Sequence, residues 1–241
     1  MEKKTRLVEY YNNQGQVHLG PSTATIFYSQ CGEDLEIYID FFHKHLEKFK
    51  DNGTYIELGA SDGVKFSNTK YFEEELGFKG ILIEPLPSFH KVLLRTRPNN
   101  YIYQCAISQD AEYLDFLVSQ GVGAGWVSGL EKYMNEEHKN AWHKDTRKIK
   151  VKCRQIKDLI EENSIDKIEL FSIDVEGAEY EVLKTFDWNT PVYVFCIELC
   201  GANEEKDKLC RDKLLEKGYT FHKRVGLSEI WYDKEYIERI K

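Results

Sequence analysis

The sequence predicts an α/β protein with a doubly wound, mainly parallel sheet of seven strands. Short apolar segments of strand length alternate with helical patterns along most of the chain. A glycine-containing turn directly follows the first of these strands, and several strands end in an acidic residue. Strands that alternate with helices form parallel sheets through right-handed crossovers. The last two strands are separated by only three residues, so we expect them to form an antiparallel hairpin.

Length and charge narrow the class of protein. The 241 residues are enough for one domain with a sizeable core. The formal net charge of −8 argues against nucleic acid as the main partner, because phosphate binding needs a basic surface. The longest apolar run, at 191–200, is too short to span a membrane. We see no secretory signal and expect a cytoplasmic protein whose six scattered cysteines are reduced thiols.

We expect residues 1–27 to form an N-terminal extension, because they lack clear periodicity. Residues 28–241 are then a single domain with an insertion at about 120–148. Apolar residues at helical spacing predict a helix within 30–49. The alternation then gives strands at 54–58, 80–84 and 101–107, with helices at 67–76 and 87–97. Gly77 follows the first of these helices as a C-terminal cap would, and Pro87 suits the first turn of the second.

The second half of the chain repeats this alternation. Two segments with alternating polarity, 113–119 and 148–154, flank the glycine-rich stretch. The predicted elements that follow are helix 155–162, strand 167–174, helix 177–186, strand 192–199, helix 203–217 and the hairpin strands 219–224 and 228–232.

Four carboxylates mark the ends of predicted parallel strands: Glu57, Glu84, Asp174 and Glu198. Ligands of doubly wound sheets bind outside the carboxyl ends of the strands. Carboxylates gathered along this edge would repel one another unless a cationic ligand or hydroxyl donors lie between them. The sequence therefore places the functional site at this edge.

The turn Gly59-Ala60-Ser61-Asp62-Gly63 helps to distinguish between nucleotide ligands. A dinucleotide needs free backbone N–H groups for its pyrophosphate, hence the G-x-G-x-x-G pattern. Here the spacing is G-x-x-x-G, and Asp62 would repel phosphate. S-adenosylmethionine has no phosphate and carries a net positive charge, so it suits an acidic turn. Glu84 could accept the ribose hydroxyls of either ligand.

Two alternatives remain beside an S-adenosylmethionine-dependent enzyme. An NAD-dependent sugar oxidoreductase or epimerase would need a Tyr-x-x-x-Lys pair or an equivalent hydride-handling site near a strand end, and we expect none there. A non-catalytic ligand-binding module would keep its role when the carboxylates are substituted.

Several motifs together resemble the FkbM-type S-adenosylmethionine-dependent methyltransferases. They are "YSQCGEDLEIYI" (28–39), "YIELGASDGVKFSNT" (55–69), "GILIEPLPSFHKVLLRTRP" (80–98), "CAIS" (105–108) and "FSIDVEGAEYEVLKTFDW" (171–188). The resemblance covers roughly residues 28 to 232. It implies a Rossmann-like class I methyltransferase fold and O-methyl transfer to a hydroxyl of a sugar, glycan or other small-molecule acceptor.

The resemblance also implies which residues bind the cofactor. Glu84 and Pro85 match the ribose-binding segment. Gln30 either points into the site or only caps the helix that follows it. The other positions belong to the glycine turn, to the segment opening the first helix, to the strand end beside the adenine and to the later acidic strand end: Glu57, Gly59, Ala60, Ser61, Asp62, Gly63, Ser67, Asn68, Thr69, Cys105, Ala106, Ile107 and Asp174.

Asp174 is the candidate catalytic base, because it ends a strand facing the expected methyl group. Glu198 is the second candidate catalytic residue. Alternatively, Asp174 and Glu198 hold a divalent cation such as Mg²⁺ or Mn²⁺, which prefer oxygen ligands. Glu176 either contacts the acceptor or favours the start of the following helix.

The stretch 120–148 interrupts the alternation and contains Trp126 and Trp142. Aromatic rings suit the C–H faces of a sugar, and a long loop in a compact domain is often functional. We therefore expect this stretch to close over the site and select the acceptor. The alternative is a helical flap that only packs on the sheet.

Overall fold

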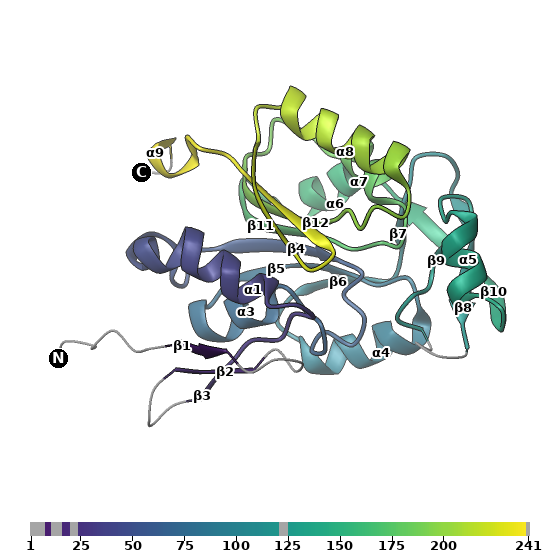
Figure 1. The fold of residues 1–241 in the computed structure, drawn as a ribbon, viewed down its shortest axis with the longest axis horizontal. Coiled ribbons are helices and arrows are strands. Elements are labelled where there is room, and N and C mark those ends of the chain that lie inside the picture. Colours follow the sequence, from purple (N-terminus) through teal and green to yellow (C-terminus); the bar gives the residue numbers. More distant parts are fainter. Residues whose placement is uncertain (1–7, 11–15, 20–23, 121–124, 240–241) are drawn as a thin grey trace.

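The computed structural model describes residues 8–10, 16–19, 24–120 and 125–239. Its centre is a seven-stranded sheet in the order β13-β14-β12-β11-β4-β5-β6 (Figure 1). The strands β4 (Thr54–Leu58), β5 (Lys79–Ile83), β6 (Tyr101–Tyr103), β11 (Ile168–Ile173) and β12 (Val192–Glu198) are parallel. Chain order reverses between β4 and β11. That switch point is where a doubly wound sheet opens a crevice for ligands.

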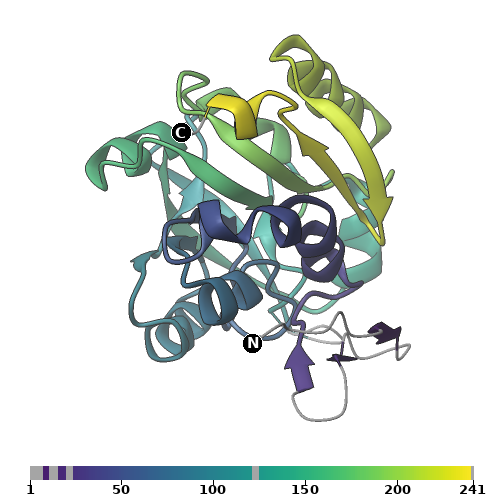
Figure 2. The same cartoon turned by 90° about the vertical axis from the view of Figure 1, so that its left-hand side faces the viewer.

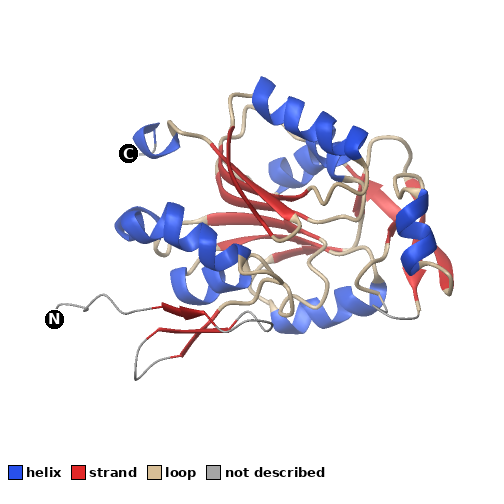
Figure 3. Ribbon diagram, viewed as in Figure 1, coloured by secondary structure: helices blue, strands red, loops and turns tan. Residues whose placement is uncertain are grey.

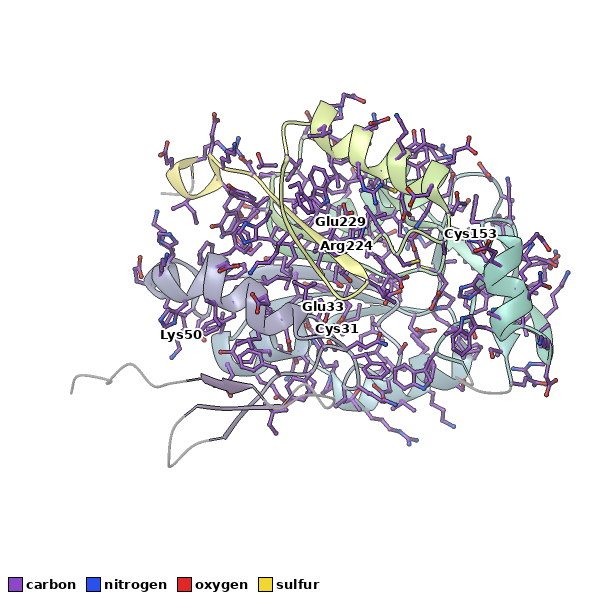
Figure 4. The ribbon with its side chains drawn as sticks, viewed as in Figure 1. Cys31, Glu33, Lys50, Cys153, Arg224 and Glu229 are labelled. Carbon is purple, nitrogen blue, oxygen red and sulfur yellow. The ribbon has the colours of Figure 1, made fainter. Side chains whose placement is uncertain are left out.

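The C-terminal hairpin is antiparallel, as the sequence predicts. Strands β13 (Thr220–Val225) and β14 (Ser228–Tyr232) pair with each other, and β14 also pairs antiparallel with β12. Arg224 and Glu229, on the two strands of this hairpin, form an ion pair (Figure 4). The turn at Gly226 packs closely on Cys31, so the hairpin reaches the segment that begins α1.

Helices cover both faces of the sheet (Figures 1 and 2). Alternate residues of each strand face opposite sides, so β4 contributes Ile56 to one apolar cluster and Tyr55 to the other. The first cluster includes side chains of α6 (Ile156–Glu162), α7 (Glu179–Thr185) and α8 (Glu204–Glu216). The second includes side chains of α1 (Glu33–Ile37), α2 (Leu46–Phe49), α3 (Lys70–Leu76), α4 (Pro87–Thr96) and α9 (Tyr236–Arg239).

A second, four-stranded sheet lies at one end of the molecule, on the right in Figure 3. Its order is β7-β10-β8-β9, with β7 (Ala106–Ile107), β8 (Tyr113–Ser119), β9 (Gly129–Leu130) and β10 (Thr146–Arg154). Helix α5 (Glu136–Trp142) lies beside it. The stretch 120–148 is therefore partly built into a sheet, and residues 121–124 within it lie outside the described residues.

Three predicted elements differ in detail. The single strand expected at 101–107 is divided between the two sheets, because β6 pairs with β5 whereas β7 pairs with β10. The helix expected from residue 67 begins at Lys70, because Ser67, Asn68 and Thr69 bind a buried carboxylate described below. The helix expected within 30–49 is divided by a π-helical segment, Tyr38–Phe42, and a 3₁₀ turn, His43–His45.

Within residues 1–27, the described parts form a small antiparallel sheet of β1 (Val8–Tyr10), β2 (Gln16–Leu19) and β3 (Ala24–Ile26). Across the described ranges, every helix is too short or too polar to cross a membrane.

Candidate functional site

A cavity of about 660 Å³ opens at the carboxyl ends of β4, β5, β11 and β12. Segment 125–142 forms its opposite wall, with Gly125, Trp126, His138 and Trp142 among the lining residues. Most of the predicted site residues meet here: Gln30, Gly59, Ala60, Ser61, Ser67, Glu84, Pro85, Cys105, Ala106, Ile107, Trp126, Trp142, Asp174, Glu176 and Glu198. The strand ends and the inserted segment thus share one concave surface.

Gly59 joins two of the strand ends. Its φ is 75°, and a Cβ at this position would lie 1.9 Å from the Asp174 carbonyl oxygen. Only glycine tolerates both the left-handed backbone and this contact. The Asp174 N–H in turn donates to the Leu58 carbonyl at 3.3 Å. Gly59 therefore allows the ends of β4 and β11 to lie in direct contact at the floor of the cavity.

The backbone N–H groups of the glycine turn are used within the protein. Those of Gly59 and Ala60 donate to the Ile83 carbonyl, and that of Gly63 donates to the Ala60 carbonyl. The groups of Val64 and Lys65 both donate to Asp62 Oδ1 at 2.9 Å. The turn is thus closed on itself, unlike a phosphate-binding loop, whose N–H groups point at the ligand.

Glu84 is held rigidly at the cavity wall. Its two carboxylate oxygens accept the N–H groups of Ser61 (2.9 Å) and Leu86 (2.7 Å). The side chain is buried, and burial raises its pKa to about 7 despite these two hydrogen bonds. A carboxylate fixed in this way can accept further hydrogen bonds from ligand hydroxyls without losing rotamer freedom.

Three further acids face the cavity together. Asp174 is exposed to the cavity, but loss of surrounding water and the charge of Glu179 raise its pKa to about 6, while a hydrogen bond with Glu198 opposes this shift. Burial and the Asp174 charge raise the pKa values of Glu176 and Glu198 well above the ordinary value. The negative charges around each of these acids therefore favour its protonated form more than in an isolated carboxylic acid.

Aromatic side chains line the opposite wall. Trp126 contacts Phe89 and Phe66, with ring centroids 4.9 and 5.4 Å apart, and the Lys65 ammonium lies 5.1 Å from its ring. The bulky residue Phe66 has φ 65°, a left-handed conformation that such residues rarely adopt. Trp142 is 41% exposed and reaches the cavity from the end of α5. Neighbouring rings thus hold Trp126 in place, whereas Trp142 is accessible to a ligand.

His138 connects this wall to the acidic floor, although the sequence gives no reason to single it out. Its Nε2 lies 3.1 Å from the Val127 carbonyl oxygen and donates to it. Its Nδ1 lies 3.5 Å from Glu176 Oε2. Helix α5 thereby contacts the turn after β11, and the approach of Gly177 to the Tyr133 carbonyl brings the same two segments together.

Five residues expected to bind the cofactor do not line the cavity. Glu57 is buried and instead accepts hydrogen bonds from Ser67 Oγ, the Asn68 N–H and Thr69 Oγ1 at 2.6–2.9 Å. Asn68 Nδ2 donates to Ser172 Oγ, and the Asp62 carboxylate closes its own turn. Gly63 packs against Leu93. The five residues therefore support the residues that line the cavity without lining it themselves: Glu57, Asp62, Gly63, Asn68 and Thr69.

Arg97 connects several of these supporting residues and was not identified from the sequence. Its side chain is fully buried and donates to Tyr55 Oη (2.7 Å), the Gly63 carbonyl (3.0 Å) and Thr69 Oγ1 (3.1 Å). It also forms an ion pair with Glu73. Arginine at the end of an amphipathic helix usually extends into solvent, so the sequence carried no signal of this burial.

The metal alternative finds little support in the arrangement of side chains. Among the residues described, no group of three or more His, Cys, Asp and Glu side chains is placed to hold a metal ion. Asp174 and Glu198 could supply two carboxylate oxygens, with water completing the near-octahedral shell that Mg²⁺ needs.

The strand order, the antiparallel β14 between β12 and β13, and the acidic strand ends define a methyltransferase-like α/β fold. The chain belongs to the FkbM methyltransferase family: the family model for the methyltransferase FkbM domain matches residues 57–221. This confirms the family resemblance of the sequence motifs.

The solved structures that match this chain share little sequence with it. A methyltransferase FkbM from Methylobacillus flagellatus shares 14% identity at a TM-score of 0.49, covering 80% of this chain and 46% of that one. Fibrillarin from Aeropyrum pernix, solved with S-adenosyl-L-methionine, shares 12% identity at a TM-score of 0.46, covering 94% of this chain and 98% of that one. The chain thus spans about half of the Methylobacillus protein. Comparison with curated protein sequences gives no significant match.

Proposed function

We propose that the protein is an S-adenosylmethionine-dependent O-methyltransferase that acts on a hydroxyl of a sugar or glycan. The observation that carries the cofactor assignment is the closed glycine turn beside a fixed carboxylate. The turn offers its own N–H groups to internal acceptors, so it is poorly suited to a pyrophosphate. Glu84 can accept hydrogen bonds from the hydroxyls of a ribose. The carboxylates at the floor of the cavity suit a cationic ligand.

The NAD-dependent alternative is weaker on the same grounds. Tyr-x-x-x-Lys spacings occur in the chain at Tyr180/Lys184 and Tyr219/Lys223. None of these side chains is among those lining the cavity. Lys184 pairs with Glu181 and Lys223 pairs with Glu36 and Asp40, so neither pair is placed for hydride chemistry there.

The residues present fit methyl transfer as follows. When bound, S-adenosylmethionine supplies a methyl group already activated by its sulfonium. Asp174 accepts the proton of the acceptor hydroxyl, which makes the acceptor oxygen a better nucleophile. The Trp126 and Trp142 rings hold the C–H face of the sugar, which orients its hydroxyl. Glu198 keeps Asp174 in place through their hydrogen bond.

Calorimetry and labelled transfer test this proposal. We expect the wild-type protein to bind S-adenosylmethionine, and Glu84→Ala to bind it at least about tenfold more weakly, because hydrogen bonds to a charged group contribute about 1.5–3 kcal/mol each. Transfer of a labelled methyl group to a panel of methyl glycosides should then identify the acceptor. Tight binding of NAD without a response to S-adenosylmethionine would reject the assignment.

Loss of transfer on adding EDTA, with recovery on adding Mg²⁺ or Mn²⁺, would instead establish a metal-dependent form.

A further inference from the structure

The turn that carries Asp174 and Glu176 has an unusual backbone. Glu176 has φ 55° and Gly177 has φ 110°, so two consecutive residues are left-handed. A non-glycine residue in this region is strained, and the strain persists only where surrounding contacts impose it. Something outside the turn must therefore hold it.

The first contact comes from Glu179, at the start of α7. Its Oε1 accepts the N–H groups of Val175 at 3.3 Å and Gly177 at 3.0 Å, the residues on either side of Glu176. The Glu179 side chain is fully buried. One carboxylate oxygen thus fixes the turn through two backbone groups, and the other oxygen needs a partner of its own.

That partner is Lys206 of α8, which forms an ion pair with Glu179 Oε2. The same ammonium lies 2.8 Å from Asp207 Oδ1, and Asp207 Oδ2 accepts the Gly201 N–H at 2.8 Å. Asp207 is fully buried, and the Lys206 side chain is 12% exposed. Burial alone would lower the pKa of Lys206, but the two carboxylates raise it, so the lysine is charged.

Lys206 therefore joins the two loops that carry the acids of the cavity floor. Glu179 holds the turn after β11, with Asp174 and Glu176, while Asp207 holds the loop after β12, next to Glu198. Lys206 and Glu179 themselves are not among the lining residues of the cavity. A buried cation between two buried carboxylates is stable only while all partners are present.

We propose that Lys206 is a positioning residue for methyl transfer, which sets the Asp174–Glu176 turn through Glu179. The proposal rests on the proposed function for its catalytic consequence. Its structural consequence is independent of any acceptor, because the Val175 and Gly177 amide protons are protected only while Glu179 is held in place.

The experiment compares Lys206→Met, Lys206→Arg and a control, Lys208→Met, on the exposed face of the same helix. Hydrogen exchange of the whole protein, with and without S-adenosylhomocysteine, reports on the peptide that covers 174–178. We expect its exchange to be about tenfold faster or more in Lys206→Met, because breaking a buried pair strongly destabilises its surroundings. Lys206→Arg should largely restore protection, and Lys208→Met should match the wild type.

Methyl transfer is measured on the same variants with the methyl glycoside that the wild type methylates best. We expect kcat to fall about tenfold or more in Lys206→Met, with the dissociation constant of S-adenosylmethionine changed less than about threefold. Unchanged exchange at 174–178, or unchanged kcat in a folded Lys206→Met protein, would overturn the proposal. If the wild type methylates none of the glycosides but exchange responds as expected, the positioning role stands and the acceptor assignment fails.

A triple variant covers the case in which Lys206→Met does not fold. Lys206→Met/Glu179→Gln/Asp207→Asn removes the cation and both carboxylate charges while leaving oxygens to accept the turn N–H groups and the Gly201 N–H. Low kcat in this folded variant supports a positioning role that needs the ion pair. Wild-type kcat in it would mean that Lys206 acts only on stability, which contradicts the proposal.

Discussion

At the scale of single residues, Asp174 illustrates how position gives a common side chain a distinct chemistry. It directly follows β11, its carbonyl lies against Gly59, and its carboxyl shares a hydrogen bond with Glu198. The restricted water around it raises its pKa to about 6, closer to neutrality than that of an ordinary aspartate. A base with such a pKa is still ionised at neutral pH and binds a proton more readily than an ordinary aspartate does.

We predict that Asp174→Asn lowers turnover by about 10² or more while changing the affinity for S-adenosylmethionine little, because the shape is kept and the base is lost. Labelled methyl transfer and calorimetry measure the two effects. Asp187→Asn, at an exposed site, is the matched control. Near-normal turnover by Asp174→Asn would exclude it both as base and as essential metal ligand.

At the scale of elements, the wall formed by segment 125–142 is attached at several points. Asn135 caps α5 by accepting the His138 N–H at 2.7 Å, and its Nδ2 donates to the Ala202 carbonyl in the loop after β12. His138 then reaches Glu176. These contacts place the segment against the acidic strand ends, so its side chains form one wall of the cavity.

We predict that Trp126→Ala raises the acceptor KM or lowers kcat/KM while leaving the affinity for S-adenosylmethionine nearly intact, because the ring lines the cavity wall that we propose to bind the acceptor. Trp142→Ala should act in the same direction. Tyr113→Ala, at a ring that is 51% exposed on β8, serves as the control. If both tryptophan variants fold and keep wild-type acceptor kinetics, the acceptor binds elsewhere.

At the scale of the whole molecule, the buried Arg97 joins β4, the glycine turn and α3. We predict that Arg97→Lys lowers the free energy of unfolding by about 3 kcal/mol or more, because lysine cannot replace the planar guanidinium and leaves buried acceptors unpaired. Urea unfolding followed by circular dichroism measures this. Arg95→Lys, at an exposed position of α4, the helix that Arg97 directly follows, should change stability little. Equal stability of the two variants would contradict this role.

The acids of the cavity also give the ligand-free protein a distinct dependence of stability on pH. Burial and neighbouring negative charges raise the folded-state pKa of Glu198 above its unfolded value. Its contribution is therefore most favourable at pH values below the unfolded pKa and is lost as pH rises through the folded pKa. Glu84 and Asp174, with pKa values near 7 and 6, act in the same direction.

We predict that Glu198→Gln raises the melting temperature at pH 8 and changes it little at pH 5, because glutamine keeps the hydrogen bond to Asp174 without a charge. Differential scanning calorimetry at both pH values measures the difference. The exposed Glu205→Gln on α8 provides the comparison. A lower melting temperature of Glu198→Gln at pH 8 would show that its negative charge stabilises the fold.

Local patterns in the sequence determined the strands and helices of the central sheet, the glycine turn and the acidic strand ends. Each of these depends on residues close together in the chain, through side-chain period, backbone sterics or capping. Even the closing hairpin followed from two strands too near in sequence to pair in any other way. The carboxyl-edge position of the site could be predicted because parallel strands all end on the same side.

Only the tertiary structure decided which predicted residues face the cavity and which support it from behind. Glu57 lies next to the glycine turn in sequence, but its side chain is enclosed by residues further along the chain. These are the segment 67–69, about 10 residues later, and Arg97, 40 residues later. The approach of His138 to Glu176, the pairing of β7 with β10, and the Lys206–Glu179 ion pair join segments that no local pattern relates. Such contacts form where helices and strands that are distant in sequence pack against each other. The periodicity of the sequence shows which face of an element is buried, but it does not show which residues of another element lie opposite that face.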